Sequence, residues 1–506
     1  MIKKLLLPLF AIFFSLTLFI SCSDDDGPID RPDPPAELSE DKEVQNFIWQ
    51  GLNLWYFWQE SVPNLADDKF ATDDEYVNFI NNSSEPEDFF ESLIYNRSSV
   101  DFWSWIVDDY VELEKLFQGV SMHNGVEFGL VGISQSNDIF GYVRYVLPDT
   151  NAVSTQIKRG DIFTHVNGTK LTRDNYRDLL FSGNDSYTLS LAKIENNTII
   201  PTGVDVELTK SEYTENPVFL AKTFEESGKK IGYLMYNGFT SSFDQDLNNA
   251  FLQFKNEGVT DLVLDFRYNP GGSVQSAIYL AGMVTGQFKG ELFTKERWNS
   301  KLQAEFEANY PDWLVNNFTD AIVKKDSNGN VILNEDLNSL NLSNVHIIVT
   351  HSSASASELI INGLNPYINV KLIGEQTVGK YVASITLYDS DNFGREGANP
   401  DHSYAMQPIV LEEINKLGEN DKDGFEPHIP ISEDFENMGV LGERNEPLLQ
   451  VAINDILGIA PKMIPGKRSD YDNISNSKLH SKLSDNMYIE KSEITKYINR
   501  EFLDKN

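Results

Sequence analysis

The spacing of apolar residues changes several times along the chain, and each change predicts a different kind of structure. Over residues 40–118, large apolar side chains recur at helical intervals, as in Phe47, Ile48, Leu52 and Trp55. Such a stripe is typical of helices that pack one face against a core. We therefore predict an N-terminal helical domain over this range.

Short strand patterns follow over residues 119–212. Runs rich in β-branched and aromatic residues, such as Val126–Ser134 and Ile162–Val166, are separated by Gly, Asn and Asp. Two short helical patterns interrupt these runs near 151–157 and 172–181. The range is therefore predicted to be a domain built mainly of short strands.

Residues 213–460 alternate between strand and helix patterns. An apolar strand at 231–236 precedes an amphipathic helix at 244–257, and similar strand–helix pairs recur further along. This rhythm predicts an α/β core with parallel strands. Residues 286–344 interrupt it and are expected to lie outside the core as an insertion. Residues 461–506 are polar and are predicted to form a weakly ordered tail with one short helix.

The N-terminus carries a targeting pattern. Residues 1–21 contain two lysines, an apolar run and a final small residue, and they precede Cys22, the single cysteine of the chain. This arrangement resembles a lipobox, although Phe19 stands where Leu is usual. It predicts a lipoprotein signal peptide, lipidation at Cys22 and a flexible acidic, Pro-rich tether at 22–39. The protein is then expected to be an exported lipoprotein of the bacterial outer membrane, on its periplasmic or cell-surface face. An incidental thiol in a discarded peptide is the alternative.

Charge and composition exclude several classes of function. The chain has 77 acidic and 41 basic residues, for a formal net charge of −36, which repels nucleic acid. One cysteine allows neither a disulfide framework nor a cysteine zinc cluster, and no histidine or acidic cluster has metal-ligand spacing. Gly374–Lys380 fits a phosphate loop, but Tyr381 stands where Ser or Thr is required. We therefore expect no metal, cofactor or nucleotide.

One serine lies where a nucleophile could be activated. An apolar strand at 345–350 runs through small residues into a helix pattern at 356–364, and Ser355 lies at the junction. A hydroxyl at a helix N-terminus is near N–H groups that favour developing negative charge. The N–H of Ala356 could then contribute to an oxyanion hole. A Ser-rich turn that only caps the helix explains the same pattern.

A lysine follows the next apolar strand. Lys380 comes after Gly379 in a segment of small and polar residues. Lysine accepts a proton only when it is uncharged, so its pKa would have to fall from about 10.4 to about 7–8 through burial. A surface lysine on a turn is the commoner outcome.

Together these segments resemble a peptidase family. The run Ser353–Glu358, with Gly379–Lys380 after it, resembles the signature of the carboxyl-terminal processing peptidases, also called tail-specific proteases. In this family the middle serine is the nucleophile and the lysine, 25 residues later, is the general base; the same spacing separates Ser355 from Lys380. Family members often have Gln four residues after the lysine, where this chain has Ser384. A hydroxyl there could still bind the amine.

A second segment agrees with the resemblance. Asp265–Gly272 is similar to the D-x-R-x-N-x-G-G turn of the family. The resemblance implies that an N–H of Gly271 or Gly272 forms the oxyanion hole together with that of Ala356. Glycine permits the close approach of backbone that such a site needs.

A third segment resembles a PDZ domain. Lys158–Gly168, with Ile157 at the leading apolar position, resembles the PDZ pattern L-x-x-G-D-x-I-x-x-V-N-G. The resemblance implies that Phe128, Gly129, Leu130 and Val131 form the loop and edge strand that bind a peptide terminus. A plain strand is the alternative for these four residues.

The resemblance implies a fold and a function. The expected fold is an α/β protease core of the crotonase-like ββα type, with an embedded PDZ domain that forms a β-sandwich or barrel, and an N-terminal helical domain. The expected function is that of a serine endopeptidase that cleaves exported polypeptides, recognised by their C-terminal tails, through a Ser355/Lys380 dyad. Its expected partners are polypeptide substrates and, through the lipid anchor, the outer membrane. A non-catalytic peptide-binding PDZ lipoprotein and a hydrolase of small esters are the alternatives.

Overall fold

The computed structural model describes most of the chain. It covers residues 36–459, apart from 197 and 327–328, and residues 471–480, 486–490 and 492–498. The predicted signal peptide, Cys22 and most of the predicted tether lie outside the described residues. Within the described ranges, no helix has both the length and the apolarity needed to cross a bilayer.

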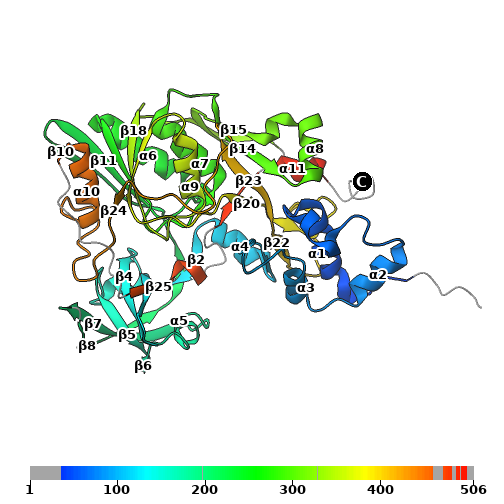
Figure 1. Cartoon of the computed structure of the whole chain (residues 1–506), viewed down its shortest axis with the longest axis horizontal. Coiled ribbons are helices and arrows are strands. Elements are labelled where there is room, and N and C mark those ends of the chain that lie inside the picture. Colours follow the sequence, from blue (N-terminus) through cyan, green and yellow to red (C-terminus); the bar gives the residue numbers. More distant parts are fainter. Residues whose placement is uncertain are drawn as a thin grey trace, which may run out of the picture.

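Helices dominate the N-terminal region, as predicted. They are α1 (Glu43–Trp55), α2 (Asp73–Asn81) and α3 (Pro86–Ser92), and they lie together at one end of the molecule (Figure 1). The predicted apolar stripe of α1 is fully buried in the main core. The region is not wholly helical, because β1 (Trp105–Val107) pairs with β22 (Ala405–Gln407) before α4 (Tyr110–Phe117) begins.

The α/β core contains the parallel sheet that the strand–helix rhythm predicts. Its strands run in the order β10-β11-β12-β18-β19-β24, and all are parallel except β10. Their bounds are Val218–Glu226, Lys229–Tyr236, Asp261–Asp265, Asn344–Val349, Asn369–Gly374 and Ile429–Pro430.

Helices cover both faces of this sheet, which explains its continuous apolar strands. Leu262 and Leu264 face the cluster that includes α6 (Asp244–Glu257), α7 (Val274–Thr285) and α9 (Ala356–Leu364), whereas Val263 faces the cluster that includes α10 (Pro447–Ile456). Figure 1 shows α10 on the opposite face of the sheet from α6, α7 and α9.

The predicted insertion at 286–344 does not lie wholly outside the core. It contributes β14 and β15 to a second sheet, in the order β13-β26-β20-β23-β14-β15. The bounds are Gly272–Ser273, Met487–Tyr488, Val382–Ser384, Ile409–Asn415, Leu292–Trp298 and Val315–Asn317. The burial of most of β14, including Phe293 and Trp298, is the reason for this placement. α8 (Ser300–Asn309) and the hairpin of β16 (Ala321–Lys325) and β17 (Val331–Asp336) complete the segment.

A separate β-domain occupies residues 126–209. Its sheet has the order β25-β3-β4-β5-β7-β8, with β6 paired to β5, and its core is distinct from that of the α/β body. The strands are Val126–Ile133 (β3), Ile139–Val146 (β4), Ile162–Val166 (β5), Thr169–Lys170 (β6), Ser186–Glu195 (β7) and Thr198–Thr209 (β8), with α5 at Tyr176–Leu180. A ribbon of β2 (Val120–His123) and β9 (Ser211–Thr214) leads into and out of it.

Two buried arginines hold the β-domain against the α/β body. Arg144 of β4 donates to Ser352 Oγ at 2.9 Å and lies over the ring of Tyr268. Arg159 contacts Glu433 at 2.6 Å. Charged hydrogen bonds of this kind, away from water, fix the orientation of two packed units.

The C-terminal segment corrects the prediction of a weakly ordered tail. Its described parts form β25 (Tyr471–Asn476) in the β-domain, β26 in the second sheet and the short helix α11 (Ser492–Tyr497). Apolar residues such as Ile489 and Ile494 are buried in the main core. The polar composition of the segment as a whole hides these anchors, because Ile494 stands alone among polar residues and Ile489 belongs to a run of only three residues, Met487–Ile489.

A buried ion network supports the turn after β12. Arg267 is fully buried and donates to Asp265 at 2.7 Å and to Glu446 at 2.6 Å. Glu446 also caps α10 through the N–H of Leu449. The guanidinium therefore links the end of β12 to the helix on the far face of the sheet.

We expect Arg267→Met to lower the free energy of unfolding by about 3–5 kcal/mol, because Asp265 would stay buried without a counter-charge and Glu446 would keep only Arg159, at 3.6 Å. Arg297→Met is the matched control, since the Arg297–Glu412 pair is half exposed on the arginine side and such pairs contribute less than about 1 kcal/mol. Urea unfolding followed by circular dichroism measures both. Equal losses in the two variants would contradict the role of the network.

The same network predicts acid sensitivity. Burial would raise the pKa of Glu433, but the charges of Arg159 and Arg267 and the hydrogen bond from Tyr268 lower it to about 2 from 4.5. The stabilisation is therefore complete above pH 4.5 and is lost as the pH falls towards 2, with a total of about 3 kcal/mol. Unfolding free energies measured between pH 6 and 3 should fall less in Glu433→Gln than in the wild type. Parallel pH profiles would disprove the assignment.

Candidate active site

Strand order brings the predicted site segments together. β12 and β18 are parallel neighbours, so the turns that follow them meet at the same edge of the sheet. The turn after β12 carries Asn269 and the glycine pair, and the turn after β18 leads to Ser355 at the start of α9. Asn269 O accepts the N–H of Ala354 at 3.2 Å, which joins the two turns directly.

The three serines of the Ser353–Glu358 run have different roles. Ser353 Oγ donates to Phe266 O at 2.7 Å, and Ser357 Oγ donates to Asn269 O at 3.1 Å. Both hydroxyls therefore hold the turn together. Ser355 Oγ is buried and has no hydrogen-bond partner among the described residues. Ser355 is thus the serine of the run whose hydroxyl is available for chemistry.

The backbone of Ser355 is strained. Its φ is 64° and its ψ is −117°, a conformation that a non-glycine residue rarely adopts. Residues held in such conformations cost about 1–3 kcal/mol and are found at functional sites. Here the strain turns Ser355 Cβ and Oγ towards Gly271: a Cβ on Gly271 would lie 2.5 Å and 2.7 Å from these atoms.

The glycine pair passes directly beside the serine. A Cβ on Gly271 would lie 3.0 Å from the backbone N of Ala356, which is the first residue of α9. Gly271 donates its own N–H to Asn269 Oδ1 at 2.9 Å, so Gly272 is the better candidate of the pair for an oxyanion donor. The oxyanion hole of Gly272 and Ala356 stays a prediction.

A buried glutamate joins the serine turn to the lysine loop. Glu358 Oε2 accepts the N–H groups of Ser355 at 2.7 Å and Lys380 at 2.9 Å. Its Oε1 accepts the Thr377 hydroxyl and the Gly379 N–H, both at 2.6 Å. Burial raises the pKa of Glu358 to about 7, and these four hydrogen bonds oppose that rise. One carboxyl group thus sets the distance between the two predicted catalytic segments.

Lys380 is buried beside Ser355 but does not hydrogen-bond to it. Its side chain is 1% exposed, and both residues line one cavity of about 10 Å³. The amine lies 3.5 Å from Asn486 Oδ1 and 5.5 Å from the centre of the Trp103 ring. The amine is therefore withdrawn from solvent and held near the C-terminal segment.

Ser384 lies in the same cluster. Its hydroxyl is buried and donates to Asn486 Oδ1 at 3.1 Å and to Met487 O at 3.2 Å. Ser384 and Lys380 thus share one amide oxygen, and Ser384 is linked to the amine through Asn486. The predicted direct role of this hydroxyl in orienting the lysine stays untested.

The four predicted peptide-binding residues lie in β3. Phe128, Gly129, Leu130 and Val131 pair with β4 on one side and, except for Phe128, with β25 on the other. Phe128 instead accepts the backbone N–H of Ser477, the residue after β25, and donates its own N–H to the Ser477 hydroxyl. The edge that was predicted to receive a peptide therefore holds a strand of the same chain.

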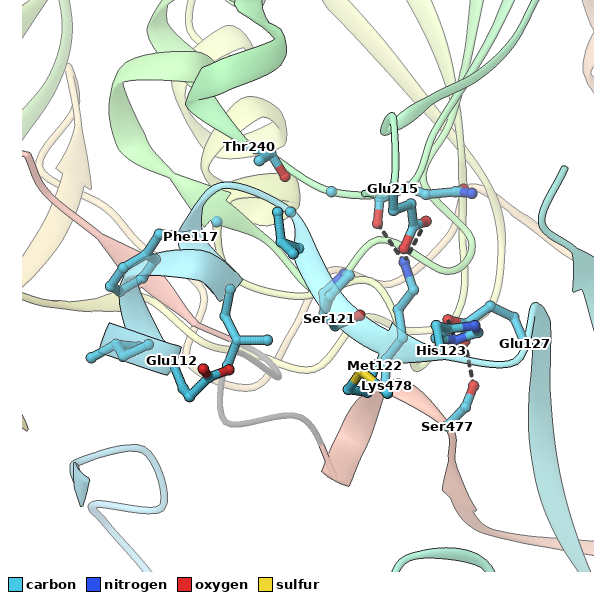
Figure 2. A pocket seen from close by; sticks show the side chains of 18 of the residues that line it. Glu112, Phe117, Ser121, Met122, His123, Glu127, Glu215, Thr240, Ser477 and Lys478 are labelled. Carbon is cyan, nitrogen blue, oxygen red and sulfur yellow. Dashed lines mark hydrogen bonds and ion pairs between the residues drawn. The ribbon is translucent and has the colours of Figure 1, made fainter. Parts of the chain in front are cut away.

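A cavity of about 640 Å³ connects this edge with the catalytic turn. It is bounded by α4, β2 and β3 at one end and by Gly271 and Gly272 at the other. Figure 2 shows Glu127, His123 and Ser477 together on one wall, and Lys478 directed at Glu215.

Sequence reasoning did not find three of the residues at the site. Glu358 could have been found, because Ser and Glu three residues apart before an apolar helix form a capping-box pattern. Trp103 and Asn486 carry no such signal, since they come from segments far from the motif in sequence.

Comparisons with known proteins agree with this geometry. Residues 230–394 match the model of peptidase family S41, and residues 43–105 match that of the S41 N-terminal domain. A CtpA-like serine protease of Staphylococcus aureus (strain N315) is 25% identical over 287 residues, which cover 55% of this chain and 50% of the relative. A carboxyl-terminal-processing protease of a Picosynechococcus species is 27% identical over 214 residues, which cover 42% and 43%. The chain thus spans about half the length of these relatives or less.

One solved structure shows the same fold. The crystal structure of an S41 protease from Bacteroides fragilis NCTC 9343 matches with a TM-score of 0.57 and 24% identity, over 82% of this chain and 98% of that one. The two family models lie in the expected order along the chain, and the site segments fall within the larger of them. Over residues 43–105 and 230–394 the chain therefore carries the two domains of peptidase family S41, and it is a relative of the carboxyl-terminal processing proteases.

Proposed function

We propose that the protein is a serine endopeptidase with a Ser355/Lys380 dyad. The observation that carries the proposal is the pairing of an unpartnered, strained serine at a helix N-terminus with a buried lysine in the same small cavity. A buried amine favours its uncharged form, which is the form that can accept a proton. A relative named as a serine protease and another named as a carboxyl-terminal-processing protease support the same reaction.

The proposed reaction follows from these positions. Lys380 Nζ accepts the proton of Ser355 Oγ as the oxygen attacks the scissile carbonyl carbon. The N–H groups of Ala356 and Gly272 stabilise the resulting oxyanion. The C–N bond then breaks, Lys380 returns the proton to the leaving amine, and water hydrolyses the acyl-serine ester. Apart from the hydrolytic water, the groups named in this scheme are side chains or backbone of the protein.

We further propose that the β-domain is a PDZ domain that presents substrate. A peptide would add to β3 as an extra strand and use the backbone groups of Gly129 and Leu130 for affinity. The 640 Å³ cavity would then lead the rest of the polypeptide to Gly271 and Gly272. The crotonase-like assignment of the core and the lipid anchor at Cys22 in the outer membrane are proposed from sequence alone.

One observation favours a second function. The Lys380 amine lies within 3.5 Å of Asn486, while Ser355 Oγ has no partner among the described residues. This arrangement also fits a binding protein that has lost catalysis. A fluorophosphonate probe separates the two functions, because it should label Ser355 in the wild type and fail to do so in Lys380→Ala. A wild type that stays unlabelled would favour the binding protein.

We expect Ser355→Ala and Lys380→Ala each to lower kcat/KM on unfolded polypeptide by about 10³-fold or more, because each removes one member of a unit. Lys422→Ala is the matched control, since that side chain is exposed and close to the same loop. In the wild type, kcat/KM should rise with pH as the lysine loses its proton. Full activity in either dyad variant would refute the mechanism.

We expect Glu358→Gln to lower both activity and stability. An amide offers one acceptor oxygen, so its NH₂ group would face two of the four donors that now bind the carboxyl group. Unpaired buried donors cost about 1–3 kcal/mol each. Thermal unfolding and kcat/KM measure the effect, with Glu419→Gln, at an exposed position, as the control. The hypothesis fails if Glu358→Gln behaves like the control in both measurements.

A further inference from the structure

The C-terminal segment occupies two places that the proposed function reserves for substrate. Its strand β25 lies on β3, and its strand β26 lies in the catalytic cleft. The two strands bind different parts of the molecule, and they are therefore independent observations about the same segment.

β25 binds β3 as an added peptide strand would. The pairing is antiparallel, with Asn476 opposite Gly129 and Asn473 opposite Val131. Beyond the strand, Ser477 donates its N–H to Phe128 O at 2.9 Å and accepts the Phe128 N–H at 3.0 Å. The backbone groups that would bind a peptide are thus satisfied along the whole predicted edge.

Side chains of β25 contact the surface of the β-domain along β3, which is called the peptide groove below. The register shifts at Ile474, and this side chain packs against the β-domain core. Asp472, two residues earlier, forms an ion pair with Arg173 at 2.8 Å. Tyr471 packs edge-on against Phe140. One apolar contact and one ion pair thus add to the backbone pairing, so β25 does more than pair with an open sheet edge.

β26 covers the predicted oxyanion donor. The Phe239 N–H donates to Gly271 O, and Phe239 O accepts the Ser273 N–H. Because backbone groups alternate in direction along an extended strand, the N–H and C=O of Gly272 itself point away from Phe239. On that side Gly272 pairs with Met487. Met487 also lines the cavity that holds the catalytic serine and lysine.

The residue before β26 reaches the catalytic amine. Asn486 Oδ1 lies 3.5 Å from Lys380 Nζ and also accepts the Ser384 hydroxyl. Ser355 Oγ meanwhile has no partner among the described residues. The C-terminal segment thus contacts the amine that the reaction needs at the serine.

We propose that the chain's own C-terminal segment, through residues 471–480 and 486–490, is an intramolecular ligand that competes with substrate for both the peptide groove and the catalytic cleft. The competition of this segment with substrate rests on the proposed function, whereas the binding of the segment to the peptide groove does not. The bound sequence also defines the ligand class: an extended peptide with a β-branched aliphatic residue two positions after an acidic one.

Covalent attachment makes this competitor effective at low intrinsic affinity. A tethered ligand acts at an effective concentration of about millimolar, so a free peptide must exceed that value to displace it. Displacement by a substrate would expose β3, uncover Gly272 and release Lys380 from Asn486. Substrate binding and activation of the dyad would then be one event.

The binding test uses the full chain with Ser355→Ala, so that no peptide is cleaved. The probe is a fluorescent peptide with the sequence of residues 471–477, and anisotropy gives its Kd. Ile474→Asp in the chain should free the groove and tighten probe binding at least tenfold. Leu479→Asp is the matched control, because Leu479 is exposed in the same segment and should leave Kd unchanged.

Two further measurements show whether the change in Kd comes from misfolding of the Ile474→Asp chain. Asp472→Lys changes an exposed residue and should give a smaller gain in the same direction, by breaking the Arg173 pair. A probe with Asp in place of its Ile should not bind the freed groove. Equal Kd values for the Ile474→Asp and Leu479→Asp chains, or equal binding of the two probes, would overturn the proposal.

The activity test uses Ser355-intact chains. Ile474→Asp combined with Asn486→Ala should raise kcat/KM on unfolded polypeptide, because both contacts of the segment are weakened. A fall in kcat/KM would show instead that Asn486 completes the catalytic site, and it would overturn the competition. If no chain has activity but the probe behaves as expected, the peptidase proposal fails while the intramolecular ligand stands.

Discussion

A single buried carboxyl group holds the candidate site together. Glu358 lies in α9, next to the strained serine turn, and binds the backbone of the lysine loop that follows β19. The two loops belong to adjacent parallel strands, but strand pairing fixes only the positions where they leave the sheet. The distance between the serine and the lysine beyond that edge depends on hydrogen bonds to one side chain.

Much of this arrangement could be predicted from sequence. Periodicity located the N-terminal helices, the strands of the β-domain and the strand–helix pairs of the core, because apolar side chains on these elements face well-defined cores. The choice of Ser355 over Ser353 and Ser357 came from a family spacing. The structure supplies a physical reason for that choice, since the other two hydroxyls bind backbone carbonyls of the neighbouring turn.

The errors share one cause. The insertion at 286–344 and the C-terminal segment were placed outside the body because their local composition is polar or irregular, yet both contribute strands to the second sheet. A short strand in the middle of a sheet is stabilised by its neighbours, so its own sequence needs few apolar residues. Asn486 is an example. It contacts Lys380 across a separation of 106 residues, and no local sequence pattern predicts that contact.

The position of β26 also has a consequence for how the chain folds. This strand comes from the last part of the sequence but lies in the interior of its sheet, between β13 and β20, and the contact of Ser477 with Phe128 spans 349 residues. Contacts between such distant segments form slowly, because a long loop must close before any stabilisation is gained. A chain that is synthesised from its N-terminus onwards therefore assembles the serine turn, the lysine loop and the glycine turn first. It inserts β26 last. During synthesis, each molecule passes through an interval in which its cleft is built but still open.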